Sequence, residues 1–190
     1  MRISNGNRKL DKRIGIFNLP TEKTCPGSGF CAKVCYAKKA EKLYPQCLPC
    51  REKNYELSMK KGFSKTMAGN IKKMKIGIFR IHESGDFYSQ EYLDKWKEIA
   101  KMLPEVRFFA YTKSLHLDFS KIPLNLIVIK SFGGRFDWMI DKEKDNHAVI
   151  LLDGLECPDE YYKCPGKGCG SSCCYCFKNA GQVKVAFHKH

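Results

Sequence analysis

The stretch Ile76-Gly-Ile-Phe-Arg-Ile-His82 is rich in β-branched and aromatic residues, and it predicts a buried strand. Glu83-Ser-Gly-Asp86 turns the chain. Apolar residues then recur at helical spacing over 89–103, before Pro104 ends the predicted helix. Another strand-like run covers 106–112. A strand, a helix and a strand in succession indicate parallel pairing through a right-handed crossover, so the predicted fold class is α/β.

The rest of the chain extends this pattern. Further strands are predicted at 13–19, 125–130, 148–152 and 183–187, and further helices at 32–43 and 51–73. With five or six parallel strands, the candidate architectures are an incomplete β/α barrel and an open doubly wound sheet. Both place a functional site at the carboxyl ends of their strands. We expect a β/α domain at 1–155, on which a cysteine-rich segment, 156–190, packs.

Composition excludes several classes of protein. The chain has 190 residues, of which 43% are hydrophobic and 12% aromatic, so it can form a core and is not expected to be disordered. Residues 1–13 lack the apolar stretch of a secretory signal, and no apolar run approaches the roughly 20 residues of a membrane span. We therefore expect a cytoplasmic protein that makes no membrane contact.

The charge of the chain is strongly positive. It has 34 Lys and Arg against 20 Asp and Glu, a formal net charge of +14, which favours nonspecific attraction to nucleic acid through a basic surface. Many of these lysines lie at 60–75, where a solvated helix face explains them equally well. The sequence has no helix-turn-helix or RNA-binding signature, so it predicts no base-specific contact. It leaves the oligomeric state open.

The eleven cysteines form two groups, with none between Cys50 and Cys157. An odd number in a chain without an export signal disfavours a disulfide framework and favours reduced thiols that hold metal. In the first group, Cys25, Cys31 and Cys35 lie on a loop that leads into a helix. Three close thiolates are typical of an iron–sulfur cluster, and a cubane with three protein ligands keeps one iron open to a small molecule.

The remaining cysteines leave alternatives open. Cys47 and Cys50 form a Cys-x2-Cys pair, which could complete a zinc site with the first group, supply a fourth cluster ligand or act as a redox dithiol. The second group contains a complete four-thiolate set, for iron–sulfur or for zinc. Its members are Cys164, Cys169, Cys173 and Cys176. Cys157 could replace Cys164, whereas Cys174 is expected to be spare because adjacent cysteines rarely both reach one metal.

Two polar residues after the strand at 76–82 are candidate catalytic residues. His82 could donate a proton or a hydrogen bond beside a cluster, although a histidine at a strand end is often structural. Asp86, which follows Gly85, could reach the amine of a ligand, and its alternative role is to cap the next helix. Since the carboxyl ends of parallel strands share one edge, we expect both residues on the same rim as the first cysteine group.

Five short motifs occur along the first part of the chain: Phe17-Asn-Leu-Pro20, Thr24-Cys-Pro-Gly27, Cys35-Tyr-Ala37, Arg80-Ile-His-Glu-Ser-Gly-Asp-Phe87 and Phe109-Ala-Tyr-Thr-Lys-Ser114. Together they resemble the phage gene product eighty-eight family. The closing stretches Cys173-Cys-Tyr-Cys-Phe177 and Val185-Ala-Phe-His-Lys-His190 resemble that family's cysteine-rich end. The likeness extends over about residues 13–190.

A more distant resemblance is to radical S-adenosylmethionine (AdoMet) proteins, which carry a three-cysteine loop after their first strand and an acidic, glycine-containing motif after their second. It implies an incomplete parallel β/α barrel with a cysteine-rich C-terminal metal-binding segment. It also implies that the first cysteine group binds a cluster, that Ser84, Gly85 and Asp86 hold the methionine amine of AdoMet, and that 164–176 binds an auxiliary cluster. The cysteine spacing here is x5/x3 rather than the usual x3/x2, and Asp stands in place of Glu.

The leading hypothesis is therefore an oxygen-sensitive iron–sulfur protein with two [4Fe-4S] clusters, acting as a radical-AdoMet-like or other redox enzyme on a small molecule at the open iron. One alternative is a zinc-binding module for nucleic acid, which would combine Cys47 and Cys50 with Cys173 and Cys176. The other is an electron carrier or cluster scaffold without a substrate.

Overall fold

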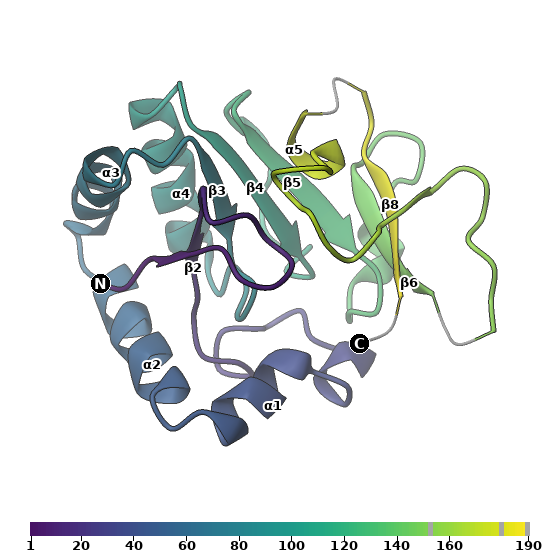
Figure 1. Ribbon diagram of the computed structural model, residues 1–190, viewed down its shortest axis with the longest axis horizontal. Helices are drawn as coiled ribbons and strands as arrows, with labels where there is room; N and C mark the ends of the chain where they lie inside the picture. The colour runs from purple at the N-terminus through teal and green to yellow at the C-terminus, as the bar shows by residue number, and fades with distance from the viewer. Residues whose placement is uncertain (152–153, 179–180, 189–190) are drawn as a thin grey trace.

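A computed structural model of the chain describes residues 1–151, 154–178 and 181–188. Within them, eight strands form one sheet in the order β1-β2-β3-β4-β5-β6-β8-β7 (Figure 1). The strands are β1 (Ser4–Asn5), β2 (Ile14–Phe17), β3 (Ile78–Ile81), β4 (Arg107–Thr112), β5 (Leu126–Ser131), β6 (His147–Leu151), β7 (Tyr162–Lys163) and β8 (Lys184–His188).

The sheet is mostly parallel. Strand β1 pairs with β2 in antiparallel fashion, and the other strand pairs of the described sheet are parallel. From β2 to β6 and on to β8, neighbours in space follow the order of the chain, without the reversal that defines a doubly wound sheet. The predicted α/β class and parallel pairing are confirmed. The sheet is open, with β1 and β7 at its edges, and nothing in its order is specific to a radical-AdoMet barrel.

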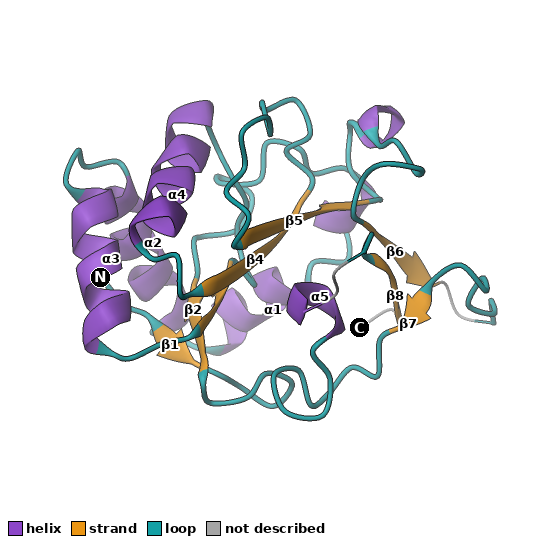
Figure 2. Cartoon of the chain, turned by 90° about the horizontal axis from the view of Figure 1, so that it is seen from above, coloured by secondary structure: helices purple, strands orange, loops and turns teal. Residues whose placement is uncertain are grey.

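Helices cover one face of this sheet. The helical elements are η1 (Phe30–Ala32), α1 (Tyr36–Leu43), α2 (Cys47–Ser58), α3 (Phe63–Lys73), α4 (Gln90–Met102), η2 (Asp137–Met139) and α5 (Tyr175–Lys178). The apolar sides of α3 and α4 pack on the sheet around Trp96, which is fully buried among Phe17, Phe63 and Phe79. Figure 2 shows α3 and α4 on one side of β4 and α5 on the other.

The opposite face is covered by the C-terminal segment. Side chains alternate along each strand, so Phe79 and Ile81 of β3 face the helices while Ile78 and Arg80 face the other way. There, Cys176 and Phe177 of α5 pack on Phe109 of β4 and its neighbours. Both faces of the sheet are thus buried, as expected for parallel strands. The predicted segment 156–190 also supplies β8, which pairs with β6 inside the same sheet.

The predicted helices differ from the observed ones in two places. The helix expected over 32–43 begins at Tyr36, because the preceding residues form η1 and turns of the cysteine loop. The helix expected over 51–73 is two helices, α2 and α3, separated near Gly62. Pro49 lies in the first turn of α2, where no backbone N–H is needed.

Two further predictions can be compared with the structure. The strand predicted over 148–152 is β6, although residue 152 lies outside the described part of the chain. Across the residues that the structure describes, no helix combines the length and hydropathy needed to cross a bilayer.

Candidate functional site: two groups of cysteine side chains

The first cysteine loop is fastened to the carboxyl edge of the sheet. Gly27 approaches the turn after β4 so closely that a Cβ atom there would lie 1.8 Å from the carbonyl oxygen of Lys113. The loop also pairs with the turn after β5, because the N–H of Arg135 donates to the oxygen of Gly27 (3.0 Å) and the N–H of Cys31 to that of Gly133 (3.3 Å). Figure 1 shows this part of the chain, which leads into α1, beneath the ends of β2 to β5.

Asp86 joins the cysteine loop to the neighbouring strands. Its backbone N–H donates to the oxygen of Thr24 (3.0 Å), one residue before Cys25. Its carboxylate accepts hydrogen bonds from the Thr112 hydroxyl (2.6 Å), the Lys113 N–H (2.7 Å) and the Phe87 N–H (2.7 Å). Burial raises the pKa of Asp86, although these three bonds oppose the shift. The predicted rim that Cys25 and Asp86 share is therefore confirmed.

In the first group, the environment of the Cys25 thiol includes the other two cysteines. Burial raises the pKa of the Cys25 thiol to about 12, and the nearby Asp86, Cys35 and Cys31 add to the effect. Cys35 is the residue before α1, and all three side chains are partly exposed. A thiol in such a place is a poor redox nucleophile, since reactive cysteines have lowered pKa values.

Ser84 and Gly85 form a tight turn that packs on the chain leaving β2. The Ser84 hydroxyl donates to the carbonyl oxygen of Leu19 (2.8 Å). Gly85 has φ +82°, and a Cβ atom on it would lie 2.6 Å from Leu19 and Thr24 side-chain atoms. The turn predicted to hold a ligand amine is thus hydrogen-bonded to the chain after β2 and packs against the start of the cysteine loop.

His82 lies on the helix-covered face and away from the thiols. It is 3% exposed and packs among Phe87, Tyr92 and Trp96, with its Nε2 atom 2.9 Å from the Tyr92 hydroxyl. Its backbone has φ +68°, and no partner is described for its buried Nδ1 atom. Burial, with a contribution from Arg80, lowers the pKa of His82 to about 3, so the ring is neutral. Its surroundings are those of a structural histidine.

The second group assembles over the other face of the sheet. The apolar cluster on that face includes Cys164, Cys169 and Cys176, and Cys173 forms a backbone bridge with Cys169. Burial raises the pKa of Cys169 to about 12 and that of Cys176 to about 11. Gly166, Gly168 and Gly170 all have positive φ, which lets the backbone turn sharply between these thiols.

Tyrosine hydroxyls contact two of the four sulfur atoms. The hydroxyl of Tyr111, on β4, donates to the Sγ atom of Cys176 at 2.9 Å. Burial raises the pKa of Tyr111 well above its ordinary value, so this hydroxyl keeps its proton. The hydroxyl of Tyr162 lies 3.5 Å from the Sγ atom of Cys173.

Arg80 is a charged residue in the middle of an apolar strand, and its side chain is 20% exposed. Its guanidinium lies over the Tyr111 ring (5.4 Å), donates to the His82 carbonyl (3.1 Å) and pairs with Glu83 (3.6 Å). Although burial opposes its charge, Tyr36, Glu83, Tyr111 and Cys169 raise the pKa of Arg80. Arg80 was not among the predicted site residues. A single cation between Phe79 and Ile81 does indicate, however, that this side chain needs a polar partner when the strand is buried.

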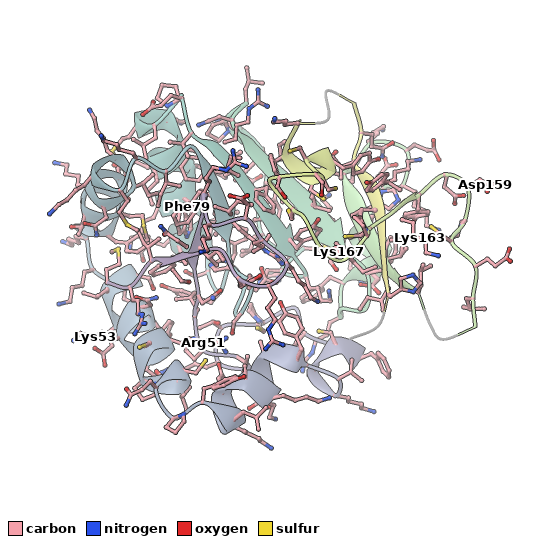
Figure 3. All side chains as sticks on the ribbon, viewed as in Figure 1. Arg51, Lys53, Phe79, Asp159, Lys163 and Lys167 are labelled. Atoms are coloured by element: carbon pink, nitrogen blue, oxygen red, sulfur yellow. The ribbon has the colours of Figure 1, made fainter. Side chains whose placement is uncertain are left out.

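The other cysteines stand apart from the four-thiol set. The Cys157 thiol donates to carbonyl oxygens of Pro158 (3.6 Å) and Tyr161 (3.5 Å), whereas Cys174 influences Arg13. Cys47 and Cys50 belong to α2, which carries Arg51 and Lys53. Figure 3 shows those two side chains at the lower left, apart from Lys163 and Lys167 at the centre and right. The structure therefore gives no support to a shared site of Cys47 and Cys50 with Cys173 and Cys176.

The remaining predictions concern metal and nucleic acid. All eleven cysteines are free thiols. Among the described residues, no three His, Cys, Asp or Glu side chains are placed so that one metal ion could contact them all.

The predicted basic surface includes exposed lysines of α3 and its flanks, opposite the buried side of that helix. They are Lys60, Lys61, Lys65, Lys72, Lys73 and Lys75. Their exposure suits a solvated helix face as well as it suits a polyanion.

The fold and the two sites define a mostly parallel α/β protein with one thiol group at the carboxyl edge of its sheet and another on a sheet face. Comparison with known proteins gives its family. The model of the family "Gene product 88" matches residues 1–154, and the chain belongs to this family. The match ends before Cys157, so the predicted likeness over 13–190 is confirmed only for its larger, N-terminal part.

Two relatives come from mycobacteriophages. The chain is 32% identical over 153 residues to the Gene 88 protein of Mycobacterium phage D29, covering 64% of each chain. It is 34% identical over 117 residues to the Gene 88 protein of Mycobacterium phage L5, covering 53% of this chain and 49% of the relative. The chain thus spans less than two thirds of either relative. No solved structure matches it, and the predicted resemblance to radical-AdoMet proteins gains no support.

Proposed function

We propose that this protein is an iron–sulfur protein with two clusters, one held by Cys25, Cys31 and Cys35 and the other by the four-thiol set of the second group. One observation carries the proposal: Cys164, Cys169 and Cys176 belong to one apolar cluster on the sheet face, with Cys173 bridged to Cys169, whereas the Cys157 thiol donates to carbonyl oxygens of its own loop. The spacing of the four-thiol set is that of a complete cluster ligand set.

The surroundings of the thiols support metal rather than thiol chemistry. Buried thiols with raised pKa values stay protonated at neutral pH, and they become thiolates where a metal replaces their protons. Four cysteines without a carboxylate or histidine form a soft donor set, which suits iron–sulfur clusters and zinc. A cluster spreads its ligands over several irons, so the proposal does not need three side chains that already converge on one point.

The first cysteine group differs from the second because it offers only three thiolates. A cubane bound there would have one iron without a protein thiolate, and that iron could take a small molecule, as in a redox enzyme. If Cys47 or Cys50 completed the set instead, the protein would be an electron carrier or a scaffold. Binding of AdoMet is the narrower form of the enzyme hypothesis, and calorimetry on the reconstituted protein tests it directly.

Anaerobic reconstitution with paired serine variants tests the two-cluster proposal. We expect Cys169→Ser to lower the iron content by about four per chain, because it removes one of four cluster ligands. The matched control is Cys174→Ser, which lies in the same segment and should keep the full iron content. Cys31→Ser and Cys47→Ser form the corresponding pair for the first group.

The spectra separate this proposal from the zinc alternative. We expect a brown protein with a broad absorption band near about 400 nm and acid-labile sulfide in proportion to iron. A colourless protein that binds about one zinc per chain and no sulfide would contradict the proposal and favour the zinc module.

A further inference from the structure

We propose that the carboxyl edge of the sheet binds a single-stranded nucleic acid, with bases stacked on Trp138 and Phe30 and phosphates held by Arg135 and Lys33. This would be a function separate from the proposed clusters, because none of these four residues is a candidate metal ligand. Two distant segments pair at this edge, and they carry exposed aromatic rings and cations without ion-pair partners.

The cysteine loop and the turn after β5 pair along this edge. Ser28 forms an antiparallel bridge with Gly134, and the guanidinium of Arg135 donates through Nε to the carbonyl of Ser28, 107 positions away (2.8 Å). A short helix follows each paired residue: η1 begins at Phe30, and η2 has Trp138 in its middle. The pairing therefore brings two aromatic residues from distant parts of the chain to one edge of the sheet.

Both aromatic side chains are exposed. Trp138 is 80% exposed and Phe30 is 59% exposed, whereas the other tryptophan of the chain, Trp96, is fully buried. Neither η1 nor η2 buries any of its residues, so the two rings do not anchor these helices in the core. Aromatic faces that are open to solvent are the surfaces on which the bases of a single strand stack, with little preference for sequence.

Two cations flank these rings. Lys33 follows η1 directly, and both Lys33 and Arg135 are exposed. Within the part of the chain that the structure describes, neither of them forms an ion pair. The nearby carboxylate of Asp137 instead accepts hydrogen bonds from the backbone N–H groups of Gly133 (2.8 Å) and Gly134 (2.9 Å). The two cations are therefore open to the phosphates of a bound strand.

A nucleic acid fits this surface better than a protein partner does. Exposed tryptophan and arginine also occur at protein interfaces. Every nucleotide, however, supplies both a base to stack and a phosphate to pair, and the net charge of +14 attracts such a polyanion. The strand must be single, because a duplex hides the faces of its bases within its own stack. The lysine-rich helix α3 lacks this combination, since its aromatic residue, Phe63, is buried.

Fluorescence titration of the full chain with oligonucleotides tests the proposal. The probes are oligodeoxythymidine and oligouridine of about twelve nucleotides. Because Trp96 is buried, we expect a bound oligonucleotide to quench the emission of Trp138 and to protect it from acrylamide. Trp138→Ala and Phe30→Ala should each raise the Kd at least about fivefold. Arg135→Gln should lower the slope of log Kd against log salt by about 0.7, the value for one phosphate contact with a single strand.

Two matched variants act as controls. Tyr44→Ala removes an aromatic ring that is 63% exposed but lies at the end of α1, outside the paired segments. Lys61→Gln removes an exposed lysine beside α3. Both should bind as tightly as the wild type. Since all the substituted side chains are exposed, circular dichroism should show the same fold for every variant.

Quenching by either oligonucleotide, together with weaker binding by Trp138→Ala, supports the proposal, and the probe that binds more tightly identifies the sugar. Polyglutamate, which carries negative charge but no bases, should not quench Trp138. If it quenches as strongly as the oligonucleotides, the surface takes an acidic protein and the proposal is wrong. It is also wrong if neither oligonucleotide quenches Trp138, or if Lys61→Gln weakens binding as much as Arg135→Gln does.

Discussion

The two cysteine groups are held in different ways. The first is tied to the sheet edge by backbone hydrogen bonds that Cys31 and Asp86 donate and Gly27 accepts, and it lies within the part of the chain that matches the family. The second lies beyond that match, and three left-handed glycines and a helix of one turn, α5, carry its thiols over the sheet face. The comparison teaches that the first group is fastened to turns at the carboxyl ends of neighbouring strands, whereas the second lies across a sheet face and is bonded to Lys9 and Ala186 at its margins.

Iron removal should affect the two regions unequally, and this is the largest effect we expect. Without metal, residues 164–178 should lose most of their protection against amide hydrogen exchange, because the proposed ligand bonds would reinforce a segment whose own backbone bonds are mostly those of turns. The loop at 24–35 should keep most of its protection through its bonds to the turns after β4 and β5. Exchange measured with and without bound iron checks this. An equal loss in both regions would contradict the comparison.

Gly27→Ala should disrupt the first cysteine group by forcing its loop away from the sheet. Its Cβ atom would lie 1.8 Å from a backbone oxygen, so the loop must move away from the sheet edge. We expect a loss of about 1–3 kcal/mol in the free energy of unfolding and a loss of iron from the first group. Denaturant titration and iron analysis measure the two effects.

The control for this variant is Gly69→Ala in α3. No atom lies within 4 Å of the Cβ position there, and alanine is the better helix former. This variant should unfold at the same denaturant concentration or a higher one. If Gly27→Ala behaves in the same way, the close contact with the Lys113 carbonyl does not hold the loop.

His82→Gln should change the pH dependence of stability. The pKa of His82 is lowered to about 3, so between its ordinary 6.5 and that value the unfolded chain binds a proton that the native chain does not. Stability is therefore lost as the pH falls through this window, by about 1.4 kcal/mol per unit. The variant should lose this part of the slope, which urea titrations between about pH 6 and pH 4.5 measure.

His82→Gln also serves as a control for the two cysteine groups. His82 follows the strand that carries Arg80, but it packs on the helix-covered face. Iron content should not change. A variant that keeps the full slope would show that the neutral ring does not contribute to acid sensitivity, and one that loses iron would place His82 near a cluster after all.

Much of the fold could be predicted from local patterns. Strands such as β3 and β4 are apolar runs with turn residues at their ends, and α4 has a clear apolar stripe with a serine cap before it. The two-residue strands β1 and β7 were missed because they are too short to show a period. The break near Gly62 was missed because lysines on both sides favour helix equally.

The site was predictable in its members and not in its surroundings. Cysteine spacing favoured the four-thiol set and left Cys157 as an alternative to Cys164, because metal ligation limits which spacings can converge. The burial of His82 among aromatic rings depends on α4, which packs from a distant part of the chain. The contact of Tyr111 with Cys176 joins residues 65 positions apart, and no local pattern encodes it.

The most direct test of the account is the number of iron and acid-labile sulfide atoms per chain after anaerobic reconstitution. Two cubane clusters predict about eight of each, falling to about four in Cys169→Ser and remaining near eight in Cys174→Ser. A folded wild-type protein that takes up fewer than about four irons, or iron without sulfide, would contradict the two-cluster account.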